Sequence, residues 1–264
     1  MGLRIVQVDA FSAKPFAGNP AAVCVLAHAA DKKWMQQVAR ELNLSETAFL
    51  FRAGDAWNLR WFTPIVEIDL CGHATLASAH VLWEDGHVPA GTQARFDTRS
   101  GRLTANRSGE WIEMDFPSQA TTPAPPLETM LEALGVEAKY VGKNRTDYLV
   151  EVENEAAVRA LSPDHTRLRT LPIRGVIVTA RASSAGFDFV SRFFAPGSGV
   201  DEDPVTGSAH CALAPFWSER LGRSSLVGFQ ASPRGGVVAV RLSGDRVILA
   251  GQAVTVLRSE LVTH

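Results

Sequence analysis

Two stretches of the sequence combine acidic, hydroxyl or imidazole side chains with the start of a predicted helix. One of them, Arg192 to Leu213, runs from an apolar strand through a Gly/Pro/Ser loop and the acids Asp201 to Asp203 to Thr206-Gly207-Ser208. Small and hydroxyl residues of this kind begin helices. Because the first turn of a helix has unpaired N–H groups and a partial positive charge, this stretch predicts a place that can hold a carboxylate.

The other stretch, Arg60 to Leu82, has the same plan and places His73 after Gly72 at a predicted helix start. Donors at such a position can polarise a substrate carbonyl or carboxylate as charge develops in a transition state. Gly72 and Gly207 allow backbone N–H groups to approach a substrate, although plain turn formation explains a glycine equally well. A lone histidine is more often structural, and Ser208 is equally well explained as a helix cap.

A third candidate is Glu46, where a predicted helix ends and an apolar strand begins, with Leu44 and Phe49 nearby. Burial among apolar side chains makes a carboxyl group a better base for a C–H proton near neutral pH. The alternative is a solvated acid in an ordinary connection. Among the three acids of the later stretch, Asp203 is favoured to face a site, because Pro204 restricts its backbone.

These residues belong to an internal repeat. Three residue pairs are each separated by 132 positions: Arg60/Arg192, Phe62/Phe194 and Pro64/Pro196. The tripeptide Ser-Ala-His also recurs at a separation of 130, beginning at Ser78 and at Ser208. A separation near half of 264 residues predicts two similar halves. If the halves face each other, both helix starts point into one cleft.

Composition narrows the class of protein. Hydrophobic residues make up 46% and charged residues 20%, which indicates a packed core rather than disorder. A net charge of −2 gives no electrostatic reason to expect nucleic acid or an anionic membrane as a partner. The first residues already alternate like a strand, so no signal peptide is expected. Three widely spaced cysteines indicate reduced thiols and a cytoplasmic protein.

The predicted elements favour an α+β fold over a doubly wound sheet. Many short strands alternate with one long helix in each half, and Asp31 is expected to cap a further helix that ends near Asn43. Gly18-Asn19-Pro20 is expected to form a tight turn, residues 127–134 a helix, and residues 162–171 an irregular segment. The proline-rich segment 117–126 is expected to be extended and to link the halves. The predicted domains are therefore 1–118 and 119–264, with the last strand able to pack on either one.

Four motifs, in order, resemble the PhzF-like family, which is related to the phenazine-biosynthesis isomerase. They are V-D-A-F…F-x-G-N-P-A-A-V (8–23), L-x-L-S-E-T (42–47), C-G-H-A-T (71–75) and D-E-D-P-V-T-G-S-A (201–209). The resemblance spans nearly the whole chain. It implies the diaminopimelate epimerase-like fold, in which two similar α+β halves each wrap a curved antiparallel sheet around a central helix, with the active site between them.

The resemblance also implies a function. The characterised family member isomerises dihydro-3-hydroxyanthranilate without a cofactor, and one glutamate removes a proton from carbon and returns it elsewhere. By motif, Glu46 is the acid/base, His73 and Asp203 are its catalytic partners, and Ser208 binds substrate. Gly72 and Gly207 are expected to bind substrate through their backbone N–H groups. The implied substrate is small and bears a carboxylate. No metal is expected, and a homodimer is possible because homodimers are common in the fold family.

Two alternatives stay open at this stage. Epimerases of this fold use two cysteines as paired acid and base, and Cys71 stands near the first position. The T-G-S-A unit has no cysteine at the second, and Cys211 lies several residues later. That departure favours a one-carboxylate shuttle over a racemase or epimerase that uses Cys71. The other alternative is a catalytically silent protein that binds a small molecule.

Overall fold

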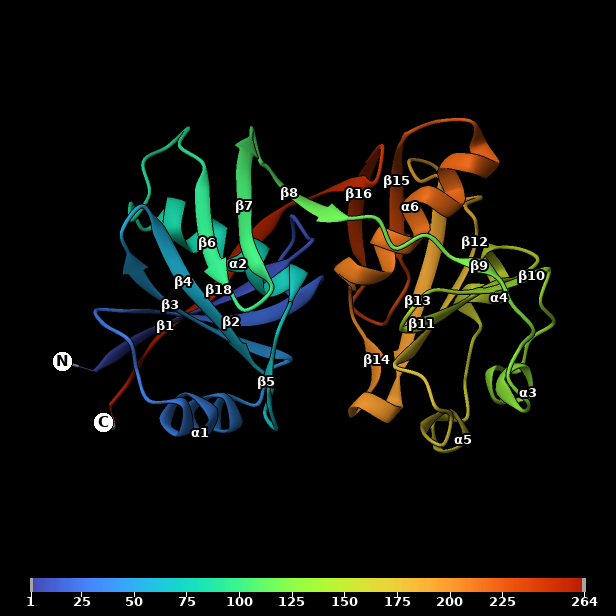
Figure 1. Cartoon of the computed structure of the whole chain (residues 1–264), viewed down its shortest axis with the longest axis horizontal. Helices are drawn as coiled ribbons and strands as arrows, with labels where there is room; N and C mark the ends of the chain where they lie inside the picture. The colour runs from blue at the N-terminus through green and yellow to red at the C-terminus, as the bar shows by residue number, and fades with distance from the viewer. Residues whose placement is uncertain (1, 263–264) are drawn as a thin grey trace. The chain divides into compact units, whose positions relative to one another are not determined.

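The computed structural model describes residues 2–262 (Figure 1). The chain forms two compact units: unit 1 contains the described residues of Met1–Asp115 and Ala250–His264, and unit 2 is Phe116–Leu249. The division after residue 115 lies three residues before the predicted boundary. The last strand, whose placement the sequence left open, groups with unit 1.

Unit 1 consists of short strands around two helices (Figure 1). Its elements are β1 (Leu3–Ala10), β2 (Asn19–Leu26), α1 (Lys32–Leu42), β3 (Glu46–Ala53), β4 (Ala56–Phe62), β5 (Glu67–Ile68), α2 (Gly72–Glu84), β6 (Ala94–Thr98), β7 (Gly101–Ser108), β8 (Trp111–Pro117) and β18 (Ala253–Leu261). Strand β8 continues two residues into unit 2.

Unit 2 has one long helix, α6, and three helices of five residues each. Its elements are β9 (Thr122–Pro123), α3 (Met130–Leu134), β10 (Tyr140–Lys143), β11 (Asp147–Glu151), α4 (Glu155–Arg159), α5 (His165–Arg169), β12 (Gly175–Arg181), β13 (Phe189–Ala195), the 3₁₀ turn η1 (Pro196–Ser198), β14 (Val200–Asp203), α6 (Gly207–Leu221), β15 (Ser225–Gln230), β16 (Gly236–Ser243) and β17 (Arg246–Gly251). Strand β17 runs on into unit 1.

Helix α1 begins and ends as its local sequence predicts. The Asp31 side chain accepts hydrogen bonds from Lys33 N at 2.8 Å and Trp34 N at 3.1 Å, which satisfies two of the unpaired donors of the first turn. Asn43 ends the helix in the left-handed conformation at φ 50°. The apolar face of α1 packs on the sheet through Met35 and Val38.

The sheet of unit 1 is covered on both faces. Ala22 and Cys24 of β2 pack in the cluster around α1. Because side chains alternate along a strand, Ala21 and Val23 face the opposite side, where α2 packs on β2. All four side chains are completely buried. Helix α2 is buried around most of its circumference, so it is the central helix that the sequence predicts for this half.

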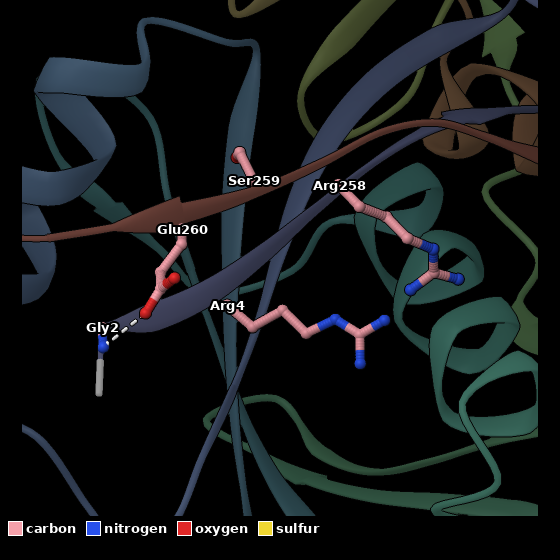
Figure 2. Close-up of a pocket in the computed structure, with 5 residues that line it drawn as sticks. All are labelled: Gly2, Arg4, Arg258, Ser259 and Glu260. Carbon is pink, nitrogen blue, oxygen red and sulfur yellow. Dashed lines mark hydrogen bonds between the residues drawn. The ribbon is translucent and has the colours of Figure 1, made fainter.

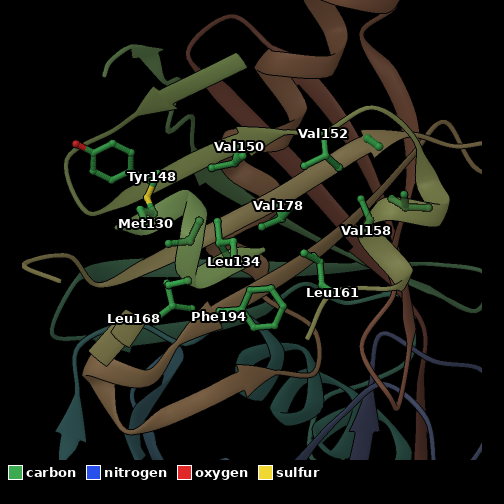
Figure 3. Packing of buried hydrophobic residues seen from close by; sticks show 14 residues of the cluster. Met130, Leu134, Tyr148, Val150, Val152, Val158, Leu161, Leu168, Val178 and Phe194 are labelled. Carbon is green, nitrogen blue, oxygen red and sulfur yellow. The ribbon is translucent and has the colours of Figure 1, made fainter. Parts of the chain in front are cut away.

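One hydrophobic cluster of unit 2 lies between the sheet and its short helices (Figure 3). Met130 and Leu134 of α3 and Leu168 of α5 pack against side chains of the neighbouring strands, among them Val178 and Phe194. These side chains are at most 3% exposed. Apolar burial of this kind stabilises the fold by roughly 25 cal/mol for each Å² removed from water.

The two units repeat one strand plan. In unit 1, β2–β3 pair in parallel, β3–β4 and β4–β5 are antiparallel, β4–β6 are parallel and β6–β7 antiparallel. In unit 2, the same sequence of pairings joins β11–β12, β12–β13, β13–β14, β13–β15 and β15–β16. Each parallel pair is bridged by helix, as parallel neighbours require a crossover. The repeat inferred from the sequence is therefore structural.

The repeated arginine has a structural task in both units. Arg60 Nε and Nη2 donate to the two carboxylate oxygens of Glu67 at 2.7 and 3.0 Å, and Arg192 makes the same paired contacts with Glu202 at 2.7 and 2.7 Å. Each guanidinium also lies over the ring of the phenylalanine two residues later. Each of these bidentate ion pairs joins a long strand to the short strand that precedes the central helix.

Several boundaries differ from the predictions. The acids 201–203 were expected in a loop but form part of β14, because Arg192 and the backbone of β13 pair with that segment. The stretch 162–171 was expected to be irregular but contains α5, which Asp164 caps by accepting from Arg167 N. The predicted helix 127–134 begins only at Met130. Within residues 2–262, none of the helices is both long and apolar enough to cross a membrane.

Candidate active site

Glu46 and His73 meet in unit 1. Glu46 is the first residue of β3, and His73 is the second residue of α2. Oε2 of Glu46 lies 2.9 Å from Nε2 of His73. The Glu46 side chain is 14% exposed and that of His73 is 5% exposed, so both groups are shielded from bulk water. The sequence predicted both residues, and the structure brings them together.

The His73 ring is fixed from its other side. Asn19 Nδ2 lies 3.1 Å from His73 Nδ1, and Cys71 Sγ lies 3.5 Å from the same nitrogen. Asn19 begins β2 and is completely buried. These contacts leave Nε2 directed toward Glu46. The sequence predicts Asn19 only as a turn residue, and the G-N-P-A-A-V motif was the signal that could have drawn attention to it.

The electrostatics of this cluster are dominated by burial and by three close groups. Burial works to lower the pKa of His73, but the Glu46 carboxylate beside it raises that pKa, which stands well above its ordinary value. Burial, reinforced by the Glu46 charge, raises the pKa of Cys71. The Cys71 side chain is therefore a neutral thiol near neutral pH, and His73 keeps a hydrogen to donate.

Unit 2 presents Asp203 beside the start of α6. The helix begins at Gly207 after Thr206, as the sequence predicts. The Thr206 hydroxyl donates to Asp203 Oδ2 at 2.5 Å. Gln230 then ties the turn together: its Nε2 donates to the Asp203 carbonyl at 2.7 Å, and its Oε1 accepts from Thr206 N at 2.9 Å. Gln230 lies in no motif of the sequence and was not predicted.

The three neighbouring acids have different partners. Asp201 pairs with Arg169 at 2.9 Å on the surface, and Glu202 is held by Arg192. Asp203 alone of the three contacts the residue that precedes α6. This separation supports the choice of Asp203 among the three for a site role. That role stays a prediction, as does the expectation that both helix starts face one cleft.

Ser208, the second residue of α6, contacts an arginine that sequence analysis did not single out. Arg174 Nη2 donates to Ser208 Oγ at 3.0 Å, and the same guanidinium pairs with Asp147. Gly207 and Gly72 are the first residues of α6 and α2. Their N–H groups lie where a helix offers no internal acceptor.

The helix starts also correct one detail of the repeat. His73 and Ser208 are each the second residue of a helix, and Cys71 and Thr206 are each the residue that precedes the helix. The Ser-Ala-His match seen in the sequence is therefore not an equivalence, because Ser78 lies in the middle of α2. The position equivalent to Cys71 is a threonine. Cys211 is buried inside α6, and burial raises its pKa to about 12.

Within the described residues, one set of side chains has the spacing and donor types to hold a metal ion. It consists of Glu46, Cys71 and His73, with ligand atoms within 4.8 Å of one another. The same short spacing serves proton transfer between the groups. The sequence-based expectation of a metal-free site stays a prediction.

A pocket of about 560 Å³ lies elsewhere in unit 1, on strands β1 and β18 (Figure 2). Its arginines, Arg4 and Arg258, extend to the same side (Figure 2). Arg258 pairs with Glu84 and Asp85, and Arg4 also pairs with Asp85. Acidic residues thus already pair with the arginines of this pocket, and none of the predicted site residues lines the pocket. The Glu46–His73 cluster is the better candidate for chemistry.

Comparison with known proteins places this geometry in a family. Residues 8–259 match the family described as phenazine biosynthesis-like protein. The chain is 54% identical over 267 residues to an uncharacterized isomerase from Halalkalibacterium halodurans, with 99% of each chain covered. The crystal structure of a phenazine biosynthesis protein of the PhzF family from Enterococcus faecalis superposes with a TM-score of 0.95 at 40% identity, covering all of both chains.

A predicted epimerase from Pseudomonas aeruginosa superposes with a TM-score of 0.80 at 25% identity, covering 99% of this chain and 100% of that one. Together these structures confirm the predicted α+β, diaminopimelate epimerase-like fold. The motifs 42–47, 71–75 and 201–209, which carried the resemblance, lie within the matched range. The chain therefore belongs to the phenazine biosynthesis-like (PhzF) family, a family of isomerase-like enzymes.

Proposed function

We propose that the protein is a cofactor-independent isomerase in which Glu46 moves a proton between two carbon atoms of a small, carboxylate-bearing substrate. The observation that carries this proposal is the shielded contact of 2.9 Å between Glu46 Oε2 and His73 Nε2. A carboxylate in such a place is largely shielded from water and lies against an imidazole on one side, which suits a general base for carbon acids.

The reaction conserves atoms and charge. The Glu46 carboxylate takes a proton from a C–H bond, and the electron pair of that bond delocalises into the unsaturated system of the substrate. Glu46, now a carboxylic acid, returns the proton to a different carbon. His73 donates to the oxygen atoms on which charge accumulates, first on Glu46 and then on the substrate. In this proposal Asp203, Ser208 and the first N–H groups of the helices hold the substrate.

The test is the exchange of hydrogen at carbon. Wild-type protein is incubated in deuterated water with a pool of small carboxylic acids, and mass spectrometry follows protein-dependent deuterium incorporation. Glu46→Gln should lower the rate by about 100- to 10,000-fold, the range for loss of a positioned acid/base. Glu41→Gln is the matched control, because Glu41 lies exposed on α1. A folded Glu46→Gln protein with undiminished exchange would remove this mechanism.

A second candidate is a racemase or epimerase that uses Cys71. The contact of 3.5 Å between Cys71 Sγ and His73 Nδ1 favours it, because His73 then links the thiol to Glu46. A neutral thiol can return a proton to carbon. The binding-protein alternative makes a different prediction, since a silent binder gives no deuterium incorporation with any bound compound.

A further inference from the structure

Arg174 of unit 2 is held in one orientation by its contacts. It precedes β12, and its Nε donates to Asp147 Oδ1 at 2.8 Å while Nη2 contacts the other carboxylate oxygen. Asp147 is 2% exposed. The guanidinium carbon also lies 5.4 Å from the ring centre of Phe193. An arginine fixed by a buried carboxylate and an aromatic ring loses little freedom when it binds a ligand.

Unused donors of this arrangement are accessible. Arg174 Nη2 donates to Ser208 Oγ at 3.0 Å, so the serine oxygen accepts and its own hydrogen is left to donate. Nη1 of Arg174 donates to none of residues 2–262, and the side chain is 39% exposed. The two hydrogens of Nη1, which belong to a permanent cation, and the hydroxyl hydrogen of Ser208 are therefore available to a ligand at the start of α6.

The start of α6 adds further donors. Thr206 precedes the helix, but its hydroxyl donates to Asp203 and makes no capping bond to the first turn. The N–H groups of the first turn thus lack that side-chain acceptor. The positive charges of Arg246 and Arg174 both work to lower the pKa of Cys211 in the same helix, whereas burial raises that pKa. Donors and positive charge gathered in this way suit an anion.

The internal repeat gives an independent argument. Thr47 of β3 pairs with Phe62, and Val176 of β12 pairs with Phe194, the repeat partner of Phe62. Glu46 therefore corresponds to Gly175, and Arg174 stands one residue before it. His73 and Ser208 are the second residues of the equivalent helices. Where unit 1 has the contact of Glu46 with His73, unit 2 has the contact of Arg174 with Ser208.

We infer that Arg174, oriented by Asp147, binds the substrate carboxylate together with Ser208 and determines the specificity of the enzyme for carboxylate-bearing compounds. The inference deepens the proposed function and rests on it.

The experiment measures binding and needs no turnover. The probe is 3-hydroxyanthranilate, an aromatic relative of the substrate that the family resemblance implies, and the control probe is 2-aminophenol, the same ring without the carboxylate. Affinities for the full chain are measured by isothermal titration calorimetry. Arg174→Ala should weaken binding of 3-hydroxyanthranilate by about 10- to 100-fold, the range for a lost charge-assisted hydrogen bond, and change that of 2-aminophenol less than about twofold.

Controls separate recognition from folding. Arg169→Ala removes another half-exposed arginine that pairs with an acid, Asp201, and should leave both affinities within about twofold. Because Arg174→Ala leaves Asp147 buried without its cation, the double variant Asp147→Asn with Arg174→Leu repeats the test without an orphan charge. Arg174→Lys should recover part of the affinity for 3-hydroxyanthranilate but not all, since lysine lacks the planar fork.

Any of three results would overturn the inference. The first is an equal loss of affinity for the two probes, and the second is an unchanged affinity for 3-hydroxyanthranilate in both the single and the double variant. The third is no saturable binding of 3-hydroxyanthranilate by the wild-type chain. Failure of the proposed function is seen separately, as undiminished deuterium exchange in Glu46→Gln.

Discussion

The repeated arginine–glutamate pairs allow the stability of the two units to be predicted from one comparison. Arg192 is 10% exposed and Glu202 15% exposed, and no other cation among the described residues pairs with Glu202. Removing one partner of a buried pair leaves an uncompensated charge, which costs about 3–5 kcal/mol. Arg192→Met, which keeps an apolar stem over Phe194, should therefore lower the free energy of unfolding by about 3 kcal/mol.

The equivalent substitution in unit 1 should cost less. Glu67 is only 1% exposed, but Lys32 and Arg99 both contact it at 3.1 Å in addition to Arg60. After Arg60→Met these two half-exposed cations still neutralise the carboxylate. The expected loss is about 1–2 kcal/mol, for the hydrogen bonds alone.

Equilibrium urea unfolding followed by circular dichroism measures both losses. Each unfolding curve is fitted for the free energy of unfolding of the unit that carries the substitution. The double variant Arg192→Met with Glu202→Met should recover most of the stability, because apolar residues of similar volume replace a buried pair at little cost. Equal losses for Arg60→Met and Arg192→Met, or a loss below about 1 kcal/mol for Arg192→Met, would refute the reasoning that neighbouring charges decide the cost.

Three further predictions concern single residues. Cys71→Ser should retain deuterium exchange within about tenfold if Glu46 is the acid/base, and loss of exchange comparable to that of Glu46→Gln would instead favour the thiol. Burial lowers the pKa of His210 to about 4, so the folded state binds fewer protons than the unfolded chain below pH 6.5, and stability falls as the pH drops from 6.5 to 4. Between pH 7 and pH 5 His210 should lower the free energy of unfolding by about 2 kcal/mol, and the urea midpoint of His210→Gln should lack this pH dependence. Equal slopes of the urea midpoint against pH for wild type and variant would contradict the prediction. A Cβ atom at Gly228 would lie 2.4 Å from the Phe189 ring, so Gly228→Ala should destabilise the protein by about 1–3 kcal/mol, and an unchanged melting temperature would count against that packing.

Features with local causes could be predicted from the sequence. Asp31 and Asn43 mark the ends of α1 because a helix cap depends on residues within one turn. The start of α6 follows Thr206 for a related reason, although the threonine side chain proved to serve Asp203 instead of the helix. Glu46 and His73 could be predicted because each lies in a motif.

Features that depend on distant contacts could not be predicted. Strand β14 is defined by its pairing with β13 and by the Arg192–Glu202 ion pair, and neither is visible in the composition of an acidic stretch. Arg174 lies 34 residues from Ser208, in a segment without periodicity that suggests a site. Asn19 contacts His73 across 54 residues. The repeat of Arg60 at Arg192 was the one available sign of a shared structural task.

The equivalence of the two units also bears on mechanism. A two-thiol exchange needs a cysteine at both helix starts, and the position equivalent to Cys71 is Thr206, which is committed to Asp203 through its hydroxyl. Cys211 cannot replace it, because burial raises the pKa of this thiol to about 12 and fixes it inside α6. If proton transfer at carbon occurs, the groups of unit 1 must therefore both remove and return the proton, or Asp203 must assist. Deuterium exchange by Asp203→Asn separates these two cases: a rate reduced as strongly as in Glu46→Gln indicates two acids, whereas a smaller loss with weaker binding indicates one.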